Sequence, residues 1–179
     1  RYRIMTDSIL RVPYGTRDIL PGEGALRRQL EQRIGRLFAS WGYDEVDTPT
    51  FEYVDTFAAT GDLDRSAFRF LDRNGRALML RTDMTAPIAR MVATRFRHHK
   101  GVKRLSYRSH LFRYEEAQAG RQCEFSQCGI EMMGAAGAEA DAEVIALAVQ
   151  TLLDAGLRDF TISLGQMEFI HGLLEAAAL

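Results

Sequence analysis

Residues 122–133, which read QCEFSQCGIEMM, decide the fold class because the two faces of this stretch differ in chemical character. Successive side chains of a strand point to opposite faces of a sheet, so every second residue shares a face. One face is apolar and predicts contact with a hydrophobic core: Cys128, Ile130 and Met132. The opposite face carries an amide, a glycine and a carboxylate: Gln127, Gly129 and Glu131.

Gly129 favours a ligand-lined face over a merely solvated one. A glycine weakens the interior of a strand, and a strand that faces water has no need of it. Between two polar residues on one face, it would leave a hollow floored by backbone. We therefore expect a small ligand to bind there, with a polar face open to water as the alternative.

Working outward, the segment before this strand ends in Phe112-Arg113-Tyr114-Glu115 and predicts another strand over about residues 102–114. If the two strands pair as a hairpin, Arg113 comes close to the face of Gln127. Its guanidinium would then be within reach of a carboxylate or a phosphate.

Asp83 and Thr85 lie at a predicted junction between a strand and a helix, where they would add an acid and a hydroxyl at a helix N-terminus. One arginine, two acids, an amide and a hydroxyl suit a zwitterionic amino acid. Each residue also has an ordinary alternative role. Asp83 and Thr85 are equally good helix caps, and Arg113 with Glu115 could form a surface ion pair.

The rest of the chain predicts strands in pairs with helices between them. A helix begins at Pro21-Gly22 and ends before Gly42, and Asn74-Gly75 predicts the turn of a short hairpin. Another strand is expected over residues 160–164. Further helices are expected after Asp83, near residue 170 and over about residues 141–155, where one apolar face would carry Val144, Ile145, Ala148, Val149 and Leu152. This order favours an α+β fold, with a largely antiparallel sheet and its helices on one side.

Composition excludes several classes of protein. The 179 residues, 46% of them hydrophobic and 26% charged, are typical of a globular chain with one sizeable core. A net charge of −1 argues against bulk attraction to nucleic acid. No apolar run is long enough to span a membrane, and the N-terminal residues lack a secretory signal, so we expect a cytoplasmic protein. The spacing of Cys123 and Cys128 predicts neither a disulfide scaffold nor a metal site.

Several linked motifs resemble those of the class II aminoacyl-tRNA synthetases. Gly42-Tyr43 with Thr48-Pro49-Thr50-Phe51-Glu52 resembles motif 1, the dimer-forming helix and strand of that class. Phe112-Arg113-Tyr114-Glu115, with Arg121, Phe125 and Glu131, resembles motif 2. Within the class, Gly15-Thr16-Arg17-Asp18 and the run from Glu124 to Glu131 are similar to the histidyl branch. The resemblance covers about residues 14–175 and implies an antiparallel sheet flanked by helices, with a homodimer contact over about residues 23–52.

That branch has two members of different function. One is histidine–tRNA ligase, which uses ATP and magnesium to activate histidine and charge its tRNA. The other is the regulatory subunit of ATP phosphoribosyltransferase, which has no aminoacylation activity and assembles with a short-form catalytic subunit in the first step of histidine biosynthesis. Three runs resemble the regulatory subunit more closely: LRTDMT at 80–85, EEAQAGRQ at 115–122 and LGQM at 164–167. We therefore favour a non-catalytic, histidine-sensing subunit without a cofactor, and keep the ligase as the alternative.

The resemblance also implies roles for individual residues. A histidine pocket would use five of them: Asp83, Thr85, Arg113, Gln127 and Glu131. An ATP site, vestigial in the regulatory subunit, would use Arg113, Glu115 and Arg121. No residue is assigned a catalytic or metal-binding role.

The domain expected over residues 1–179 is the N-terminal part of a class II synthetase-like catalytic core. The given sequence contains no motif 3, no histidine-specific Arg-Gly motif and no anticodon-binding domain. We therefore do not expect catalysis from this segment alone.

Overall fold

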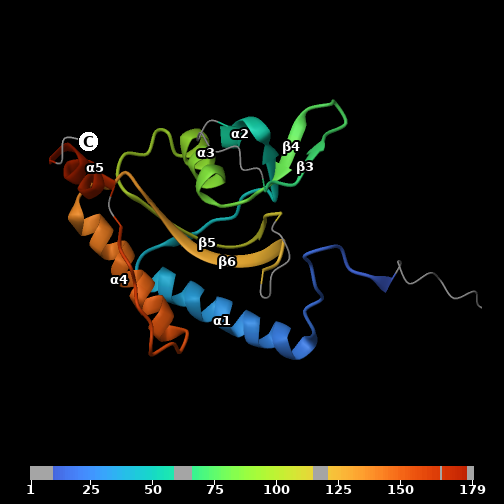
Figure 1. Ribbon diagram of the computed structural model, residues 1–179, viewed down its shortest axis with the longest axis horizontal. Coiled ribbons are helices and arrows are strands. Elements are labelled where there is room, and N and C mark those ends of the chain that lie inside the picture. The colour runs from blue at the N-terminus through green and yellow to red at the C-terminus, as the bar shows by residue number, and fades with distance from the viewer. Residues whose placement is uncertain (1–9, 59–65, 115–120, 166, 177–179) are drawn as a thin grey trace, which may run out of the picture.

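A computed structural model describes residues 10–58, 66–114, 121–165 and 167–176 of the chain (Figure 1). Its described strands form two three-stranded sheets, in the orders β1-β5-β6 and β2-β4-β3. The elements, in chain order, are α1 (Pro21–Ser40), β1 (Asp44–Glu45), β2 (Phe51–Tyr53), α2 (Val54–Ala58), β3 (Arg69–Leu71), β4 (Ala77–Leu80), α3 (Thr85–Arg95), β5 (Lys103–Phe112), β6 (Glu124–Met133), α4 (Ala138–Asp154) and α5 (Met167–Ala176).

The β5–β6 hairpin is the centre of the molecule. Its antiparallel ladder runs without interruption from the pair Lys103 and Met133 to the pair Phe112 and Glu124. The short strand β1 pairs in parallel with the other edge of β5. The predicted hairpin is confirmed, and the sheet is largely antiparallel as expected.

The second sheet is antiparallel throughout and contains the smaller predicted hairpin. Gly75 has a φ of 77°, which is a left-handed conformation that glycine adopts without strain. The Asp72 carboxylate accepts the backbone N–H groups of Asn74 (2.8 Å) and Arg76 (2.9 Å), which closes the turn. The expectation of a tight turn at Asn74-Gly75 is confirmed.

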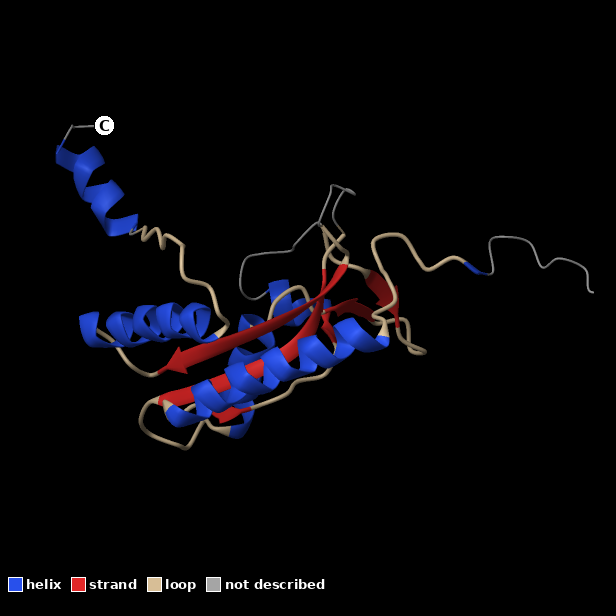
Figure 2. Ribbon diagram, turned by 90° about the horizontal axis from the view of Figure 1, so that it is seen from below, coloured by secondary structure: helices blue, strands red, loops and turns tan. Residues whose placement is uncertain are grey.

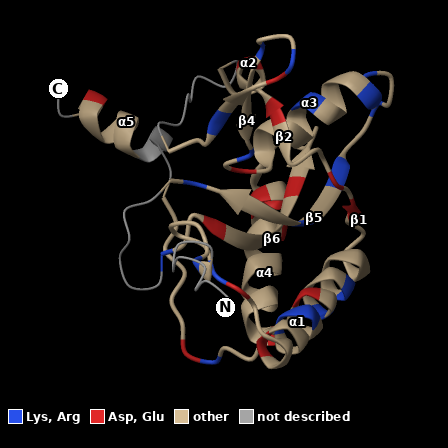
Figure 3. Ribbon diagram, turned by 90° about the vertical axis from the view of Figure 1, so that its right-hand side faces the viewer, with Lys and Arg blue, Asp and Glu red and all other residues tan. Residues whose placement is uncertain are grey.

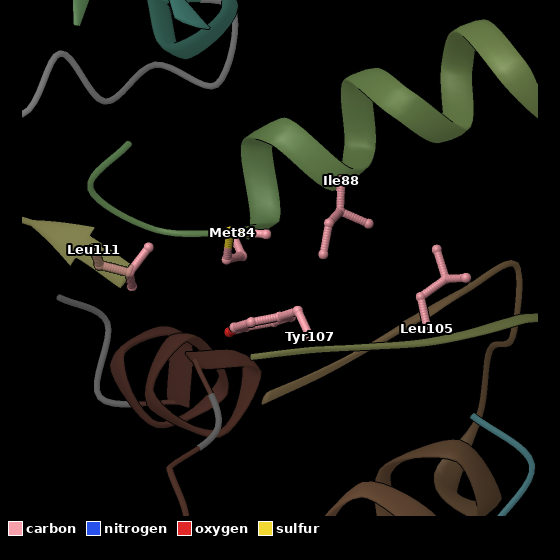
Figure 4. Close-up of a cluster of buried hydrophobic side chains, with 5 residues drawn as sticks. All are labelled: Met84, Ile88, Leu105, Tyr107 and Leu111. Atoms are coloured by element: carbon pink, nitrogen blue, oxygen red, sulfur yellow. The ribbon is translucent and has the colours of Figure 1, made fainter. Parts of the chain in front are cut away.

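Helices cover both faces of the β5–β6 hairpin, so the prediction of helices on one side was wrong. Below the hairpin in Figure 1, α1 and α4 bury Phe38 and Leu147 against the apolar face of β6, which carries Cys128, Ile130 and Met132. Above it, α3 covers the opposite face. Figure 4 shows this second core cluster: Met84, Ile88, Leu105, Tyr107 and Leu111.

Helix α1 runs along the sheet as a long rod (Figure 2), and only its second half is well packed. Ile34 and Leu37 pack against the core cluster around Phe38, whereas Leu26 near the N-terminal end is 69% exposed. Acidic and basic residues are both distributed along the helix (Figure 3), as expected for a solvated face. No helix in the described ranges is both long and apolar enough to cross a membrane.

Two details near the C-terminal end differ from the expectations. The predicted apolar face of α4 included Val144, but the structure exposes Val144 and buries Leu147 instead. Residues 160–164, expected as a strand, form no strand. A strand needs a neighbour to accept its backbone hydrogen bonds, and no described strand pairs with this segment.

Candidate functional site: the polar face of the hairpin

Thr85 and Glu131 meet where the start of α3 crosses the end of β6. The Thr85 hydroxyl donates a hydrogen bond of 2.7 Å to Oε1 of Glu131. The two residues are 46 positions apart in the chain, and α3 is held over the sheet by the burial of Met84 and Ile88. The structure therefore brings together two of the five residues expected in one pocket.

Asp83 lies next to this pair and also caps the helix. Its Oδ1 accepts the backbone N–H of Ala86 at 3.2 Å, so the ordinary capping role proposed for Asp83 is confirmed. Its charge also acts on Glu131. Burial raises the pKa of the Glu131 carboxyl, and repulsion from Asp83 raises it further, while the hydrogen bond from Thr85 lowers it. The site thus holds two carboxylates that repel each other.

Gln127 forms a hydrogen bond with Tyr107, a residue that the sequence did not predict to be part of the site. Its side-chain amide donates a hydrogen bond of 2.7 Å to the hydroxyl of Tyr107, which is buried on β5. Tyr107 pairs directly with Gly129 across the hairpin. A Cβ on Gly129 would overlap the phenol ring, so the expected hollow above Gly129 is filled by Tyr107 and that prediction was wrong. The glycine makes room for a side chain of the protein.

The charges of Glu131 and Asp83 affect the ionisation of the Tyr107 phenol. Burial raises the pKa of this phenol, and the charge of Glu131 raises it further. Gln127 and Glu131 lie on the same face of β6, as the alternation predicted. Tyr107 of β5 shares this face, which α3 covers. The missed signal was the alternation in β5, which places Tyr107 on this face once the register is known.

Arg113 lies beyond the end of β5, still on the polar side of the hairpin. Its Nε donates to the carbonyl oxygen of Thr82 at 2.9 Å, and the guanidinium carbon lies 5.5 Å from the centre of the Phe125 ring. These contacts place it near the run that carries Asp83, and no described contact joins it directly to Gln127. One of its five N–H donors is used by Thr82.

The residues expected for ATP are less well defined. Arg121 is exposed, and Glu115 lies outside the described residues, as does the run from 116 to 120. The suggested ion pair of Arg113 with Glu115 is therefore untested. In the described ranges, no cluster of three His, Cys, Asp or Glu side chains forms a metal site.

The candidate site has a negatively charged part and a positively charged part. Near the start of α3, Asp83 and Glu131 offer negative charge, with the hydroxyl of Thr85 between helix and strand. On the other side of the same run, Arg113 offers a guanidinium. A cation binds best at the first part and an anion at the second, which is the charge pattern of a free amino acid.

The fold is that of the class II aminoacyl-tRNA synthetases of the histidyl type, and its antiparallel hairpin carries the candidate polar residues. The family model of histidyl-tRNA synthetase matches residues 15–179, and the chain belongs to that family.

The relatives favour the regulatory branch. An ATP phosphoribosyltransferase regulatory subunit from Moorella thermoacetica is 51% identical over 172 residues, which cover 95% of this chain and 44% of that protein. Further curated relatives at 39–46% identity bear the same name. The predicted resemblance to this branch is confirmed. The chain spans less than half the length of these relatives.

Two solved structures share the fold. One from Bacillus halodurans, described as an ATP phosphoribosyltransferase regulatory subunit/histidyl-tRNA synthetase, has a TM-score of 0.78 and 38% identity over 84% of this chain and 39% of its own. A histidine–tRNA ligase subunit from Alicyclobacillus acidocaldarius has a TM-score of 0.73 and 32% identity over 83% of this chain and 43% of its own. Both members of the branch therefore share this architecture.

Proposed function

We propose that the chain belongs to a non-catalytic, histidine-sensing regulatory subunit of ATP phosphoribosyltransferase, which acts in the first step of histidine biosynthesis. The observation that carries this proposal is the name shared by the curated relatives, at up to 51% identity. The proposal needs no cofactor, and a cytoplasmic location forms part of it.

The polar face of the hairpin supports histidine as the sensed molecule. In the proposed complex, the ammonium group lies against Asp83 and Glu131, and Arg113 takes the carboxylate through charge-assisted hydrogen bonds. Thr85 and Gln127 supply further polar contacts. Burial and the charge of Asp83 both raise the pKa of Glu131, which supports the placement of a cation there, because a positive charge would favour the ionised carboxylate.

The decisive experiment measures two activities of the full-length protein. It is mixed with its short-form catalytic subunit, and the phosphoribosyl transfer is followed with and without histidine. In parallel, it is mixed with tRNA, ATP and labelled histidine. We expect activation of the transferase, inhibition of the complex by histidine, and no charged tRNA. Robust charging of tRNA would overturn the proposal.

Histidine–tRNA ligase is the second candidate, since a ligase subunit shares 32% identity and this fold. That function needs ATP with magnesium, bound by Arg113, Glu115 and Arg121. In the regulatory subunit the ATP site is not required, and Arg113 serves the amino acid. Calorimetric titration with ATP separates the two: tight, magnesium-dependent binding favours the ligase, and lack of binding favours the regulatory subunit.

The proposed partners are the short-form catalytic subunit and a second copy of the chain. An apolar patch formed by Phe51, Tyr53 and Phe70 supports the homodimer, because these residues share one face of the second sheet and each is at least 40% exposed. Phe51 belongs to the motif 1-like segment, and its ring contacts that of Phe70. Large apolar residues gathered on one surface are typical of a protein contact.

A further inference from the structure

Arg81 is a buried charge with an unusual set of partners. Only 5% of the residue is exposed, so its guanidinium depends on protein acceptors rather than on water. Nη1 donates to the carbonyl oxygen of Thr48 at 2.6 Å and lies 3.3 Å from Oδ1 of Asp47. Nε donates to the carbonyl oxygen of His110 at 2.9 Å. One side chain thus holds two segments that are far apart in the sequence.

The backbone of Arg81 holds the same two segments. Its N–H donates to the carbonyl oxygen of Thr50 at 3.0 Å, and its own carbonyl accepts the N–H of Phe112 at 3.0 Å. The first contact joins residues 47–50, which lead from β1 into β2. The second joins the end of β5. Arg81 therefore fixes the position of the chain at the point where β4 has just ended.

The four residues after Arg81 include two members of the candidate histidine site, Asp83 and Thr85, and contact two others. The carbonyl oxygen of Thr82 receives the hydrogen bond of Arg113, and Asp83 caps α3. Thr85 then reaches Glu131. A movement of Arg81 would therefore displace the Thr82 carbonyl that binds Arg113, the Asp83 carboxylate and the Thr85 hydroxyl, which follow within one to four residues.

We propose that Arg81 is a positioning residue for the histidine site and that it couples this site to residues 47–50. The inference rests on the proposed function, since it names what sets the geometry of that pocket. Arginine is needed because its planar fork reaches both the Thr48 and the His110 carbonyls, whereas the single ammonium of lysine cannot hold both in the same way. The coupling links the pocket to β2, which carries part of the exposed apolar patch.

The test compares Arg81→Lys with Arg104→Lys in the full-length protein. Arg104 also makes a two-point contact, to both carboxylate oxygens of Glu143 at 2.7 Å, but it lies on the opposite face of the hairpin. We expect Arg81→Lys to weaken histidine binding about tenfold at a temperature where both variants are folded. Arg104→Lys should lower the melting temperature but bind histidine within twofold of wild type. Equal affinities of Arg81→Lys and wild type would overturn the proposal.

Hydrogen exchange gives a readout that does not need histidine. In Arg81→Lys, the amides of residues 82–88 should exchange about tenfold faster, while those of α1 and α4 stay unchanged. Faster exchange together with no histidine binding by wild type would overturn the proposed function and leave Arg81 as the residue that positions this run. Unchanged exchange would overturn the inference itself.

A milder variant covers the case in which Arg81→Lys does not fold. The side chain of Asp47 is 80% exposed, so Asp47→Asn removes its charge with little effect on folding and leaves both carbonyl contacts of Arg81 in place. We expect histidine affinity to fall about two- to threefold, with an unchanged melting temperature. Unchanged affinity and unchanged exchange over residues 82–88 would contradict the coupling to residues 47–50.

Discussion

At the scale of single residues, Glu131 is held in an unfavourable state that a bound cation would relieve. Burial and the nearby Asp83 raise the pKa of its carboxyl in the folded protein. Because the folded state binds this proton more tightly than the unfolded state, the free energy of unfolding falls as the pH rises from the unfolded to the folded pKa. Above the folded pKa the ionised Glu131 therefore reduces stability, and a bound ammonium would offset that effect.

Glu131→Gln should consequently be more stable than wild type at pH 7.5. We expect a gain of about 0.5 kcal/mol in the free energy of unfolding, measured by urea denaturation, because the variant removes a buried charge and keeps a polar side chain. The difference should shrink as the pH falls below the ordinary pKa of a glutamate, where the carboxyl takes up a proton in the unfolded state as well. Glu124→Gln, on the same strand but paired with His110, is the control and should show no gain. A variant less stable than wild type at pH 7.5 would contradict this account.

Histidine affinity should change in the opposite direction. Glu131→Ala leaves the ammonium group of the ligand partly unpaired, so binding should weaken by about 2–5 kcal/mol. Arg113→Ala should weaken it by a similar amount, because the ligand carboxylate loses its cation. Cys128→Ala lies on the opposite face of β6 and should bind within a few-fold of wild type. Calorimetric titration decides: if wild type and Glu131→Ala bind equally, Glu131 does not contact the ligand.

Gly129 gives a prediction that concerns packing alone. Gly129→Ala places a methyl group against the phenol ring of Tyr107, which is buried and has little room to move. Overpacking of this kind costs about 1–3 kcal/mol of stability, measured by denaturant unfolding. The double variant Gly129→Ala with Tyr107→Leu should recover part of that loss, since the ring is removed. Purely additive effects of the two changes would argue against the contact.

At the scale of elements, α4 is fastened to the sheet by a three-residue contact. Glu143 on α4 accepts hydrogen bonds from Arg104 of β5 and from the hydroxyl of Tyr43, which follows α1. Burial, followed by the hydrogen bond to Glu143, raises the pKa of Tyr43 to about 12. The contact joins two helices and the central hairpin through one carboxylate.

This contact should make the protein sensitive to alkali. Folded Tyr43 keeps its proton up to about pH 12, whereas the unfolded side chain loses it near pH 10. Stability contributed by the neutral phenol is therefore complete below pH 10 and is lost as the pH rises towards 12. Tyr43→Phe should lose about 1 kcal/mol at pH 8, from the missing hydrogen bond, and should decline less steeply above pH 10. Urea unfolding at pH 8, 9.5 and 11 measures both, with Tyr53→Phe at an exposed site as the control.

The elements also differ in how well the sequence predicts them. Strand β6 and its two faces follow from the alternation over Gln127–Glu131, because a period of two residues favours a strand. The position of α3 does not follow in the same way. The apolar stripe through Ile88 indicates a buried helix, but it does not say which face of the sheet the helix covers. Residues 160–164 also alternate but form no strand, because alternation alone does not provide a neighbouring strand to pair with.

The candidate site was predictable by residue type and only partly by geometry. Glu131 and Thr85 were expected together because the helix start and the strand end were both predicted. The Thr85 hydroxyl lies 2.7 Å from Oε1 of Glu131. Tyr107 was missed because its position depends on the register that pairs it with Gly129, and the sequence of one strand does not specify that register. The buried contacts of Arg81 were missed because they run to backbone carbonyls, which leave no pattern in the sequence.

At the scale of the whole molecule, the exposed apolar patch on the second sheet is the feature that a single copy leaves unexplained. Its members come from β2 and β3 and share one face of the sheet: Phe51, Tyr53 and Phe70. The patch continues from the segment that resembles motif 1, and the buried pair of Glu52 with Arg90 of α3 braces the same strand from behind. A rigid strand with apolar neighbours is well suited to pair with an identical surface, since a two-fold contact uses the same patch on both copies.

The proposed homodimer predicts a specific loss of association. In Phe51→Glu, a charge replaces an apolar side chain of the patch that is 50% exposed in one copy, so the folded monomer should keep its stability. In a two-fold contact the change occurs in both copies, and two buried, unpaired carboxylates should shift the protein to a monomer at micromolar concentration. Sedimentation velocity of the full-length protein measures this shift. Leu157→Glu is the matched control, because Leu157 is 49% exposed but lies outside the patch. A Phe51→Glu variant that stays dimeric would show that the subunits associate through another surface, and a monomeric wild type would exclude the homodimer.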